Sequence, residues 1–240
     1  MDSMRGQTVV VIGASSGIGL AVARRAAQAH AAVTMVSRSR EKLQAAASSI
    51  AGDVNVVAAD TLDERAVGEA LAALPHIDHL VLTAVADENK RRGPIAELTS
   101  DQMERSLDKL RGFFFSVRAA APRMATRGSI TMTSGASALK PPHTGMSVLA
   151  AGNASVIAFG HALALELAPV RVNTITPGVV DTSVWSAADR SSIKEWAESA
   201  ELPARRFGQP DDIAGAAIFL MANPYVTGHN LVVDGGLVAT

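Results

Sequence analysis

Short apolar runs rich in β-branched residues recur along the chain, separated by longer stretches in which apolar positions recur with helical spacing. Most of the short runs are apolar at nearly every position, which is typical of strands that helices cover on both faces. The strands that this pattern predicts are Thr8–Ile12, Ala32–Val36, Val54–Ala58, His79–Thr83, Gly128–Thr133, Arg171–Ile175 and Asn230–Val233.

The longer, alanine-rich stretches between these runs are expected to be helices. They are Gly17–His30, Arg40–Ile50, Glu64–Leu74, Ser100–Ala125, Leu149–Leu167 and Pro210–Met221. Strands and helices in alternation predict an α/β fold with a doubly wound parallel sheet and right-handed crossovers. No linker, repeat or low-complexity tract divides the chain, so we expect a single domain over residues 1–240.

One segment, Asp181–Phe207, interrupts the alternation with charged and small residues of weak periodicity. In an open α/β sheet, a long excursion near the carboxyl ends of the strands often covers the crevice in which a ligand binds. We therefore predict a lid over a substrate site at about residues 181–207.

Composition narrows the classes of function. The formal net charge is −1, with acidic and basic residues spread evenly, which argues against a nucleic-acid surface or an anchor on an anionic membrane. The chain has no cysteine, so disulfides, thiolate chemistry and cysteine-ligated metal sites are excluded. No cluster of His, Asp and Glu has the spacing of a metal site.

The predicted strand Thr8–Ile12 starts close to the amino terminus and leaves no room for a secretory signal. No apolar run approaches the roughly 20 residues that a membrane span needs. We therefore expect a soluble, cytoplasmic protein that acts on a small-molecule substrate and binds neither nucleic acid nor membrane.

The first predicted strand runs into the turn Gly13–Gly19, with the sequence GASSGIG, and a helix follows. Glycines let the backbone turn sharply and approach a pyrophosphate without a Cβ in the way, and the helix amino terminus supplies unpaired N–H groups. A purely structural turn between strand and helix is the alternative. The candidate cofactor residues of this turn are Gly13, Ser15, Ser16, Gly17, Ile18 and Gly19.

The end of the second predicted strand bears on the choice of cofactor. Ser37 and Arg38 lie about 20 residues beyond the glycine turn, where an acidic residue would bind the ribose of NAD and an arginine suits the 2′-phosphate of NADP. They favour NADP(H); a solvated arginine that caps the next helix is the alternative. After the third strand, Asp60 and Thr61 can bind the adenine edge, and Asp60 can equally be a helix cap.

These motifs resemble those of the short-chain dehydrogenase/reductase family. Gly13–Gly19 resembles the family's glycine motif, and Arg171–Thr182 (RVNTITPGVVDT) resembles the segment that holds the nicotinamide carboxamide. Arg206–Gly236 resembles the carboxy-terminal signature almost throughout. The resemblance implies a Rossmann-type sheet, oxidoreductase activity with NADP(H) and, commonly, a dimer or tetramer.

The resemblance adds candidate residues at the nicotinamide end of the cofactor. In the family, a Pro-Gly turn and a following threonine hold the carboxamide. After the fourth strand, Leu82-Thr83-Ala84-Val85 stands where the family has Asn-Asn-Ala-Gly. The added candidates are Thr83, Ala84, Asn153, Pro177, Gly178, Val180 and Thr182.

The chain departs from the family at the proton donor. Family members usually carry an Asn, Ser, Tyr and Lys tetrad, in which the tyrosine transfers a proton and the lysine four residues later lowers the pKa of its phenol. This sequence has a single tyrosine, Tyr225, in the predicted loop before the last strand, and His229 lies four residues after it. No alignment register can place a Tyr-x-x-x-Lys motif in this chain.

Alignment through the long predicted helix places Leu149 at the tyrosine position and Asn153 at the lysine position. Leu149 cannot transfer a proton, and we expect it to form an apolar wall. Asn153 can still hydrogen-bond ribose hydroxyls but carries no positive charge. An ordinary polar helix residue is the alternative interpretation of Asn153.

The other tetrad positions differ as well. Gly135 stands at the usual serine position, with Ser134 before it and Ser137 just beyond, and Lys109 stands at the usual asparagine position. Lys109 is expected on a helix with one buried face, where loss of hydration lowers the pKa of an ammonium group and makes it a better acid. A lysine that is exposed, or that forms a salt bridge near Asp108 or Glu104, is the alternative.

Two functions agree with these observations. The first is an NADP(H)-dependent oxidoreductase with altered proton delivery, from Lys109, from Ser134 or a neighbouring hydroxyl, or from solvent, acting on substrates such as an iminium or a conjugated enone. The second is a non-redox homologue that keeps the nucleotide site for sensing, for structure or as the partner of an active subunit. The Pro177-Gly178 turn favours the first function, and the missing tyrosine favours the second.

The resemblance also bears on assembly. The predicted helices Ser100–Ala125 and Leu149–Leu167 are where the family usually pairs subunits, and their faces are rich in alanine and phenylalanine. We expect these faces to bury a contact between identical subunits. A homodimer or homotetramer is therefore predicted, with the tetramer favoured.

Overall fold

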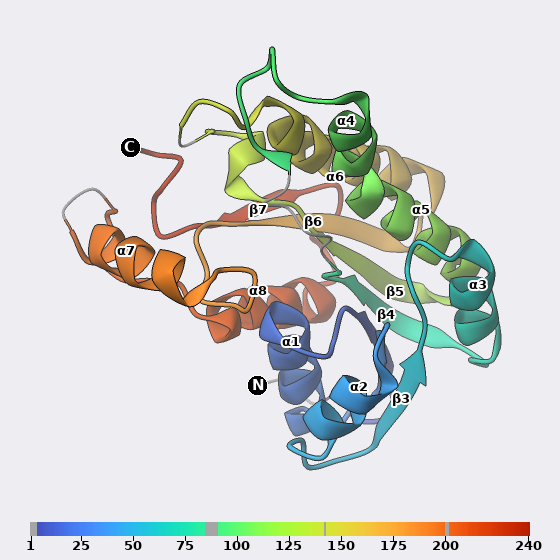
Figure 1. Cartoon of the computed structure of the whole chain (residues 1–240). Coiled ribbons are helices and arrows are strands. Elements are labelled where there is room, and N and C mark those ends of the chain that lie inside the picture. The colour runs from blue at the N-terminus through green and yellow to red at the C-terminus, as the bar shows by residue number, and fades with distance from the viewer. Residues whose placement is uncertain (1–3, 85–90, 142, 200–201) are drawn as a thin grey trace.

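A seven-stranded parallel sheet lies at the centre of the computed structural model, which describes residues 4–84, 91–141, 143–199 and 202–240 (Figure 1). The strand order is β3-β2-β1-β4-β5-β6-β7, and every neighbouring pair is parallel. The strands are β1 Thr8–Ile12, β2 Ala32–Ser37, β3 Val54–Ala58, β4 Ile77–Leu82, β5 Met124–Thr133, β6 Arg171–Pro177 and β7 Asn230–Val233. The predicted α/β fold with a doubly wound parallel sheet is confirmed.

Helices cover both faces of this sheet (Figure 1). Helices α1 and α8 pack on one face, and α3, α5 and α6 pack on the other. The helices are α1 Gly17–Gln28, α2 Arg40–Ala47, α3 Glu64–Ala72, α4 Ser100–Ser106, α5 Asp108–Ala120, α6 Ser147–Glu166, α7 Ala187–Glu198 and α8 Pro210–Ala222, with short 3-10 turns at Ala121–Arg123 and Ala136–Ala138.

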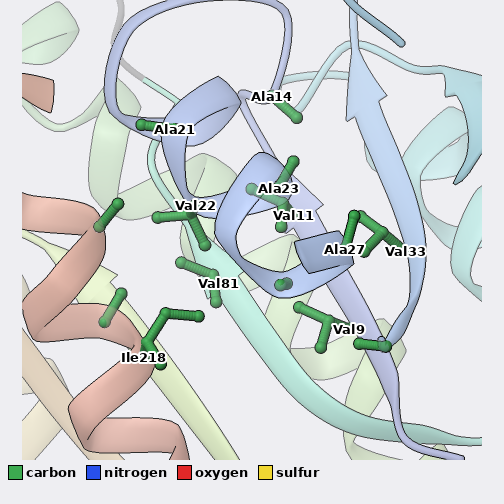
Figure 2. Packing of buried hydrophobic residues seen from close by; sticks show 14 of the residues in the cluster. Val9, Val11, Ala14, Ala21, Val22, Ala23, Ala27, Val33, Val81 and Ile218 are labelled. Atoms are coloured by element: carbon green, nitrogen blue, oxygen red, sulfur yellow. The ribbon is translucent and has the colours of Figure 1, made fainter. Parts of the chain in front are cut away.

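Strand β1 divides its apolar side chains between the two faces, as the alternation of a strand requires. Val9 and Val11 belong to the cluster with α1 and α8, whereas Val10 and Ile12 belong to the cluster with α3, α5 and α6. Figure 2 shows the first cluster, in which alanines of α1 and Ile218 of α8 surround the valines of the sheet. Small alanine side chains let α1 lie close to β1, and this contact fixes the glycine turn between them.

The prediction of one helix over Ser100–Ala125 is wrong. Two helices, α4 and α5, meet at Leu107, whose ψ of −1° departs from a regular helix. Helix α5 ends at Ala120 because Pro122 in the next turn has no N–H with which to continue it. Strand β5 then begins within the range predicted as helical. The break places Lys109 in the first turn of α5.

The segment 181–207 contains a regular helix, α7, that the sequence analysis missed. Ser186 caps this helix, because its side chain accepts a hydrogen bond from the backbone of Asp189 at 3.2 Å. Helix α7 buries few positions, of which Ile193, Trp196 and Ala197 join a small apolar cluster. Because this apolar stripe is so narrow, the sequence of α7 shows little helical periodicity. The function of the segment as a lid stays a prediction.

Helix α6 differs from the expectation that no apolar segment is long enough to span a membrane. It has 20 residues and a mean hydropathy of 1.6, so that by length and composition it is long and apolar enough to cross a membrane, contrary to the sequence analysis. The core helix of a soluble protein passes the same test. In this fold α6 packs against β6 and α5, and 44% of the apolar window is buried.

Candidate active site

A cleft of about 1290 Å³ opens at the carboxyl edge of the sheet, where the strand order reverses between β1 and β4. Every site residue proposed from the sequence lies on its wall, although the roles of these residues stay predictions. The residues are Gly13, Ser15, Ser16, Gly17, Ile18, Gly19, Ser37, Arg38, Asp60, Thr61, Thr83, Ala84, Lys109, Ser134, Asn153, Pro177, Gly178, Val180 and Thr182.

The turn between β1 and α1 leaves no space for a side chain at Gly13 or Gly19. A Cβ on Gly13 would lie 2.6 Å from the backbone nitrogen of Ala84, and one on Gly19 would lie 2.3 Å from the Gly13 carbonyl oxygen. Gly17 has a φ of +55°, which glycine adopts readily. Within the described chain, no side chain caps the first N–H groups of α1, so these donors can bind an anion. The turn therefore fits the pyrophosphate of a dinucleotide.

A cationic corner lies beyond this turn, where Ser37, Arg38 and Lys42 line the cleft. The hydroxyl oxygens of Ser37 and Ser15 lie 3.1 Å apart. Ser39 caps α2 by accepting a hydrogen bond from the Lys42 backbone at 3.2 Å, so the alternative in which Arg38 caps this helix is wrong. Two cations beside a helix amino terminus fit a phosphate group. The sequence analysis missed Lys42, although its place in the first turn of a predicted helix was a usable signal.

Asp60 and Thr61 line the cleft after β3. The Asp60 carboxylate accepts a hydrogen bond from the Leu62 backbone at 3.0 Å. Asp63, not Asp60, caps α3, since its carboxylate accepts from the Ala66 backbone at 3.0 Å. The alternative role of Asp60 as the helix cap is therefore wrong.

The far end of the cleft is built by the ends of β4 and β6. The Thr83 hydroxyl donates to the carbonyl of Ile12 at 2.9 Å and ties β4 to β1. A Cβ on Gly178 would lie 2.6 Å from the Cα of Asp234, so only glycine fits where the chain leaves β6. Val85, the last residue of the four compared with the family motif, lies outside the described residues.

Lys109 and Asn153 meet at the centre of the cleft wall. Both side chains are buried, and Lys109 Nζ donates to Asn153 Oδ1 at 2.6 Å and to the Ser134 carbonyl at 3.5 Å. Asn153 Nδ2 in turn donates to Ser137 Oγ at 3.0 Å. Helices α5 and α6 and the segment after β5 are thus joined by one polar network.

The two side chains that touch in this network are the ones that the sequence comparison assigned to the asparagine position (Lys109) and the lysine position (Asn153). Gly135 belongs to the same arrangement, because a Cβ there would lie 2.8 Å from Asn153 Nδ2. The ammonium group of α5 therefore lies beside Asn153 of α6.

The alternative in which Lys109 is exposed is wrong, because the residue is only 5% exposed. The acidic neighbour Asp108 is also buried, and it pairs with Arg91 at 3.4 Å and with Arg111 at 3.3 Å. These two arginines compensate the negative charge of the buried carboxylate. Burial of that charge without a partner would destabilise the fold.

Leu149 lies one helical turn before Asn153, buried and on the cleft wall, as expected of an apolar replacement for tyrosine. The tyrosine of the chain, Tyr225, lies between α8 and β7 and is 97% exposed. It is not among the residues that line the cleft in the described chain.

The hydroxyl groups near Lys109 differ in whether their protons are already donated in hydrogen bonds. Ser134 Oγ donates to the Asn153 carbonyl at 2.8 Å, and Thr133 Oγ1 donates to the Leu82 carbonyl at 3.2 Å. Ser137 Oγ accepts from Asn153, which leaves its own proton available. Ser134 therefore fits the role of proton donor less well than Ser137.

We call the part of the cleft lined by Arg92, Lys140, Met146, Leu149 and residues of the segment 182–196 its substrate half, and it contains residues that the sequence analysis did not single out. Trp185 and Trp196 both line it, and they are the only tryptophans of the chain. Their place in the segment that interrupts the strand-helix alternation was a usable signal. Arg92 also lines the cleft, and no motif pointed to it.

Fold and cleft together define a dinucleotide-binding α/β protein. A family model described as enoyl-(acyl carrier protein) reductase matches residues 13–238. The 3-oxoacyl-[acyl-carrier-protein] reductase of Bos taurus is 35% identical over 238 residues, which cover 96% of this chain and 97% of the bovine one. The dehydrogenase/reductase SDR family member 4 of Homo sapiens is 32% identical over 249 residues, with 98% and 88% covered.

A solved structure shows the same relationship. The NADPH-bound short-chain oxidoreductase of Pseudomonas aeruginosa PAO1, which contains an atypical catalytic center, has a TM-score of 0.90 to this chain at 28% identity, covering 99% of this chain and 98% of that one. The chain belongs to the short-chain dehydrogenase/reductase family of oxidoreductases.

Proposed function

We propose that this protein is an NADP(H)-dependent oxidoreductase whose active site works without a Tyr-x-x-x-Lys pair. The observation that carries the proposal is the contact of Lys109 Nζ with Asn153 Oδ1, 2.6 Å apart on the wall of the cleft. This contact keeps an ammonium group at the reaction end of a complete nucleotide cradle.

The preference for NADP(H) is supported by the cationic corner at Arg38 and Lys42. Gly13–Gly19 would hold the pyrophosphate, and Asn153 would lie beside the nicotinamide ribose. The NADPH-bound structure of the similar Pseudomonas protein points the same way. Bound NADPH would supply a hydride to the substrate.

The residues at the reaction end differ in what they can contribute. Lys109 Nζ offers a positive charge and a proton near the place where negative charge develops on a reduced substrate. Asn153 positions that group, and Leu149 supplies an apolar wall without a titratable group. Substrates that need little acid assistance, such as an iminium or a conjugated enone, suit such a site.

One observation favours a second function. The buried position of Leu149 holds no proton donor, so the chain can instead be a nucleotide-binding homologue without redox activity, with a sensing or structural role. Such a protein would bind NADPH and reduce nothing.

A calorimetric titration with NADPH, followed by a screen of ketones, imines and enones for loss of NADPH absorbance, separates the two functions. Stoichiometric binding with turnover of imines or enones, and very slow ketone reduction, is the expected result. Binding without turnover on all three classes would favour the homologue without redox activity. Rapid reduction of simple ketones would contradict the proposed site.

A further inference from the structure

Two adjacent arginines, Arg91 and Arg92, precede α4 and lie in different surroundings. Arg91 is buried and pairs with Asp108 at 3.4 Å, so its charge is compensated. Arg92 lines the substrate half of the cleft, where it faces the segment that follows β6. The proposed reaction assigns Arg92 no role.

An aromatic ring holds the Arg92 guanidinium in place. Its Cζ lies 5.8 Å from the centroid of the Trp185 ring, within the range of a cation–π contact. Trp185 is itself fixed, because its Nε1 donates to the Val180 carbonyl at 2.9 Å. The guanidinium is therefore oriented before any substrate arrives.

One donor of this guanidinium has no acceptor among the described residues. Arg92 Nε is buried and makes no hydrogen bond to any of them. No ion pair joins Arg92 to a carboxylate in the described part of the chain, and the nearby Asp108 pairs with Arg91 and Arg111. Asp189, the other carboxylate in this half of the cleft, accepts from Ser186 Oγ at 2.7 Å. A buried donor without an acceptor is rare and points to a missing partner.

The surroundings of Arg92 indicate the chemistry of that partner. Trp185 contacts Arg92, and further apolar side chains line the same cleft: Met146, Leu149, Ile193 and Trp196. Lys140 adds a second cation to the same half. This half of the cleft thus suits a molecule with an apolar body and a negative charge.

We propose that Arg92 binds a carboxylate of the substrate, so that the substrate is an apolar or aromatic acid that also carries the reducible group. A guanidinium can bind both oxygens of a carboxylate with two parallel N–H···O bonds, and the apolar wall strengthens them. The inference rests on the proposed function, because the acid is taken to be the molecule that accepts the hydride.

Two pairs of probes test this inference through binding alone. They are 4-carboxybenzaldehyde and 4-carboxybenzylideneacetone, each compared with its own methyl ester. All four compounds are titrated by calorimetry, first into protein saturated with NADP⁺ and then into protein without cofactor. At least one acid should bind about tenfold or more tightly than its ester, because a charge-assisted pair is lost in the ester.

Arg92→Met should abolish this preference for the acid, because methionine has no charge, while the apolar methionine side chain still covers Trp185. Arg92→Lys should retain part of the preference. Arg127→Met is the matched control, because Arg127 is exposed near the start of β5, away from the residues that line the cleft. It removes one positive charge and should leave the preference intact.

The inference is overturned if neither acid binds more tightly than its ester, or if Arg92→Met keeps the preference. It is also overturned if Arg92→Met weakens NADPH binding as much as acid binding, since the guanidinium would then serve the cofactor. A preference that depends on Arg92 in a protein without turnover would overturn the proposed function and leave the acid site in place.

Discussion

The contact between Lys109 and Asn153 depends on the lengths of the two side chains. A lysine reaches further than an asparagine, so exchanging the two between α5 and α6 keeps their combined length and moves only the point at which they meet. The polar contact can therefore span the same gap between the helices. At the scale of the residue, the proposed chemistry of this site rests on that one ammonium group.

Lys109→Met keeps the unbranched stem of the side chain and removes its charge. We expect turnover of a conjugated enone, whose oxygen gains negative charge on hydride transfer, to fall by up to about 10²–10⁴-fold, the usual worth of acid assistance, while NADPH affinity stays nearly unchanged. Steady-state kinetics and calorimetry measure the two effects. Lys194→Met, at an exposed lysine of α7 that is not among the described residues lining the cleft, should keep its turnover. Full activity of Lys109→Met would remove Lys109 from the mechanism.

We expect Arg38 to decide between the two nicotinamide cofactors. NADPH should bind more tightly than NADH by roughly 1.5–3 kcal/mol, because the 2′-phosphate gains at least one charge-assisted contact. Arg38→Asp should remove this difference in calorimetry, whereas Arg127→Asp, distant from the cleft, should leave it intact. Equal affinities of the unmodified protein for both cofactors would contradict the assignment.

Residues that belong to a continuous motif, or that stand at a position counted from the family pattern, could be predicted to lie on the cleft, and the others could not. The glycine turn and Arg38 follow a strand end, where the sequence alone fixes their neighbours. Lys109 was found only because a family position could be counted. Arg92 and Trp185 come from segments far apart in the chain, and their meeting depends on two loops that have no regular pattern.

At the scale of the elements, a buried histidine links two neighbouring strands of the sheet. His79 of β4 is almost fully buried, and its Nδ1 lies 2.8 Å from Ser129 Oγ of β5. Burial lowers the pKa of His79 to about 4. The nearby Asp78 opposes this shift, and Arg171 adds to it. The fold therefore holds this imidazole in its neutral form.

This depressed pKa makes the stability of the fold depend on pH. Between about pH 6.5 and 4 the unfolded chain binds a proton that the folded chain rejects, so the free energy of unfolding should fall as the pH falls through this window. The loss from His79 should reach roughly 3 kcal/mol near pH 4.

His79→Asn, which can keep a partner for Ser129 without titrating, should flatten that part of the curve in urea unfolding. His161→Asn, at an exposed position of α6, should leave the curve as it is. An unchanged slope in His79→Asn would contradict the assignment.

The strands could be predicted closely because each is a nearly continuous apolar run bounded by turn residues. The errors fell where apolar spacing carries no information about a boundary. The apolar positions of α4 and α5 continue through Leu107, so the break is invisible in the pattern. Helix α7 has too few buried positions to show its period.

At the scale of the whole molecule, the outer faces of α5 and α6 are the candidates for an interface between subunits. Phe114 is 42% exposed and lies 6.5 Å from the Phe159 ring, and Leu165 further along α6 is 85% exposed. Apolar side chains gathered on an open face favour burial against a second copy.

We expect light scattering at micromolar concentration to give the mass of a homotetramer. Phe114→Asp should reduce that mass, because a carboxylate in the centre of an apolar contact loses its hydration. Ile95→Asp, at a residue that is 73% exposed in the loop before α4, is the control and should not change the mass. A monomeric mass for the unmodified protein would contradict the expected assembly.

The exchange of lysine and asparagine also constrains how this enzyme can change by mutation. Asn153→Lys alone would place a second ammonium group against Lys109 in a buried site, where like charges repel strongly. Lys109→Asn alone would remove the only lysine of the network, and Leu149→Tyr alone would give a phenol without a lysine on the next turn of its own helix. We therefore expect strong epistasis between this site and the family's usual tetrad: each of these single replacements should lose function, and only their combination should restore it.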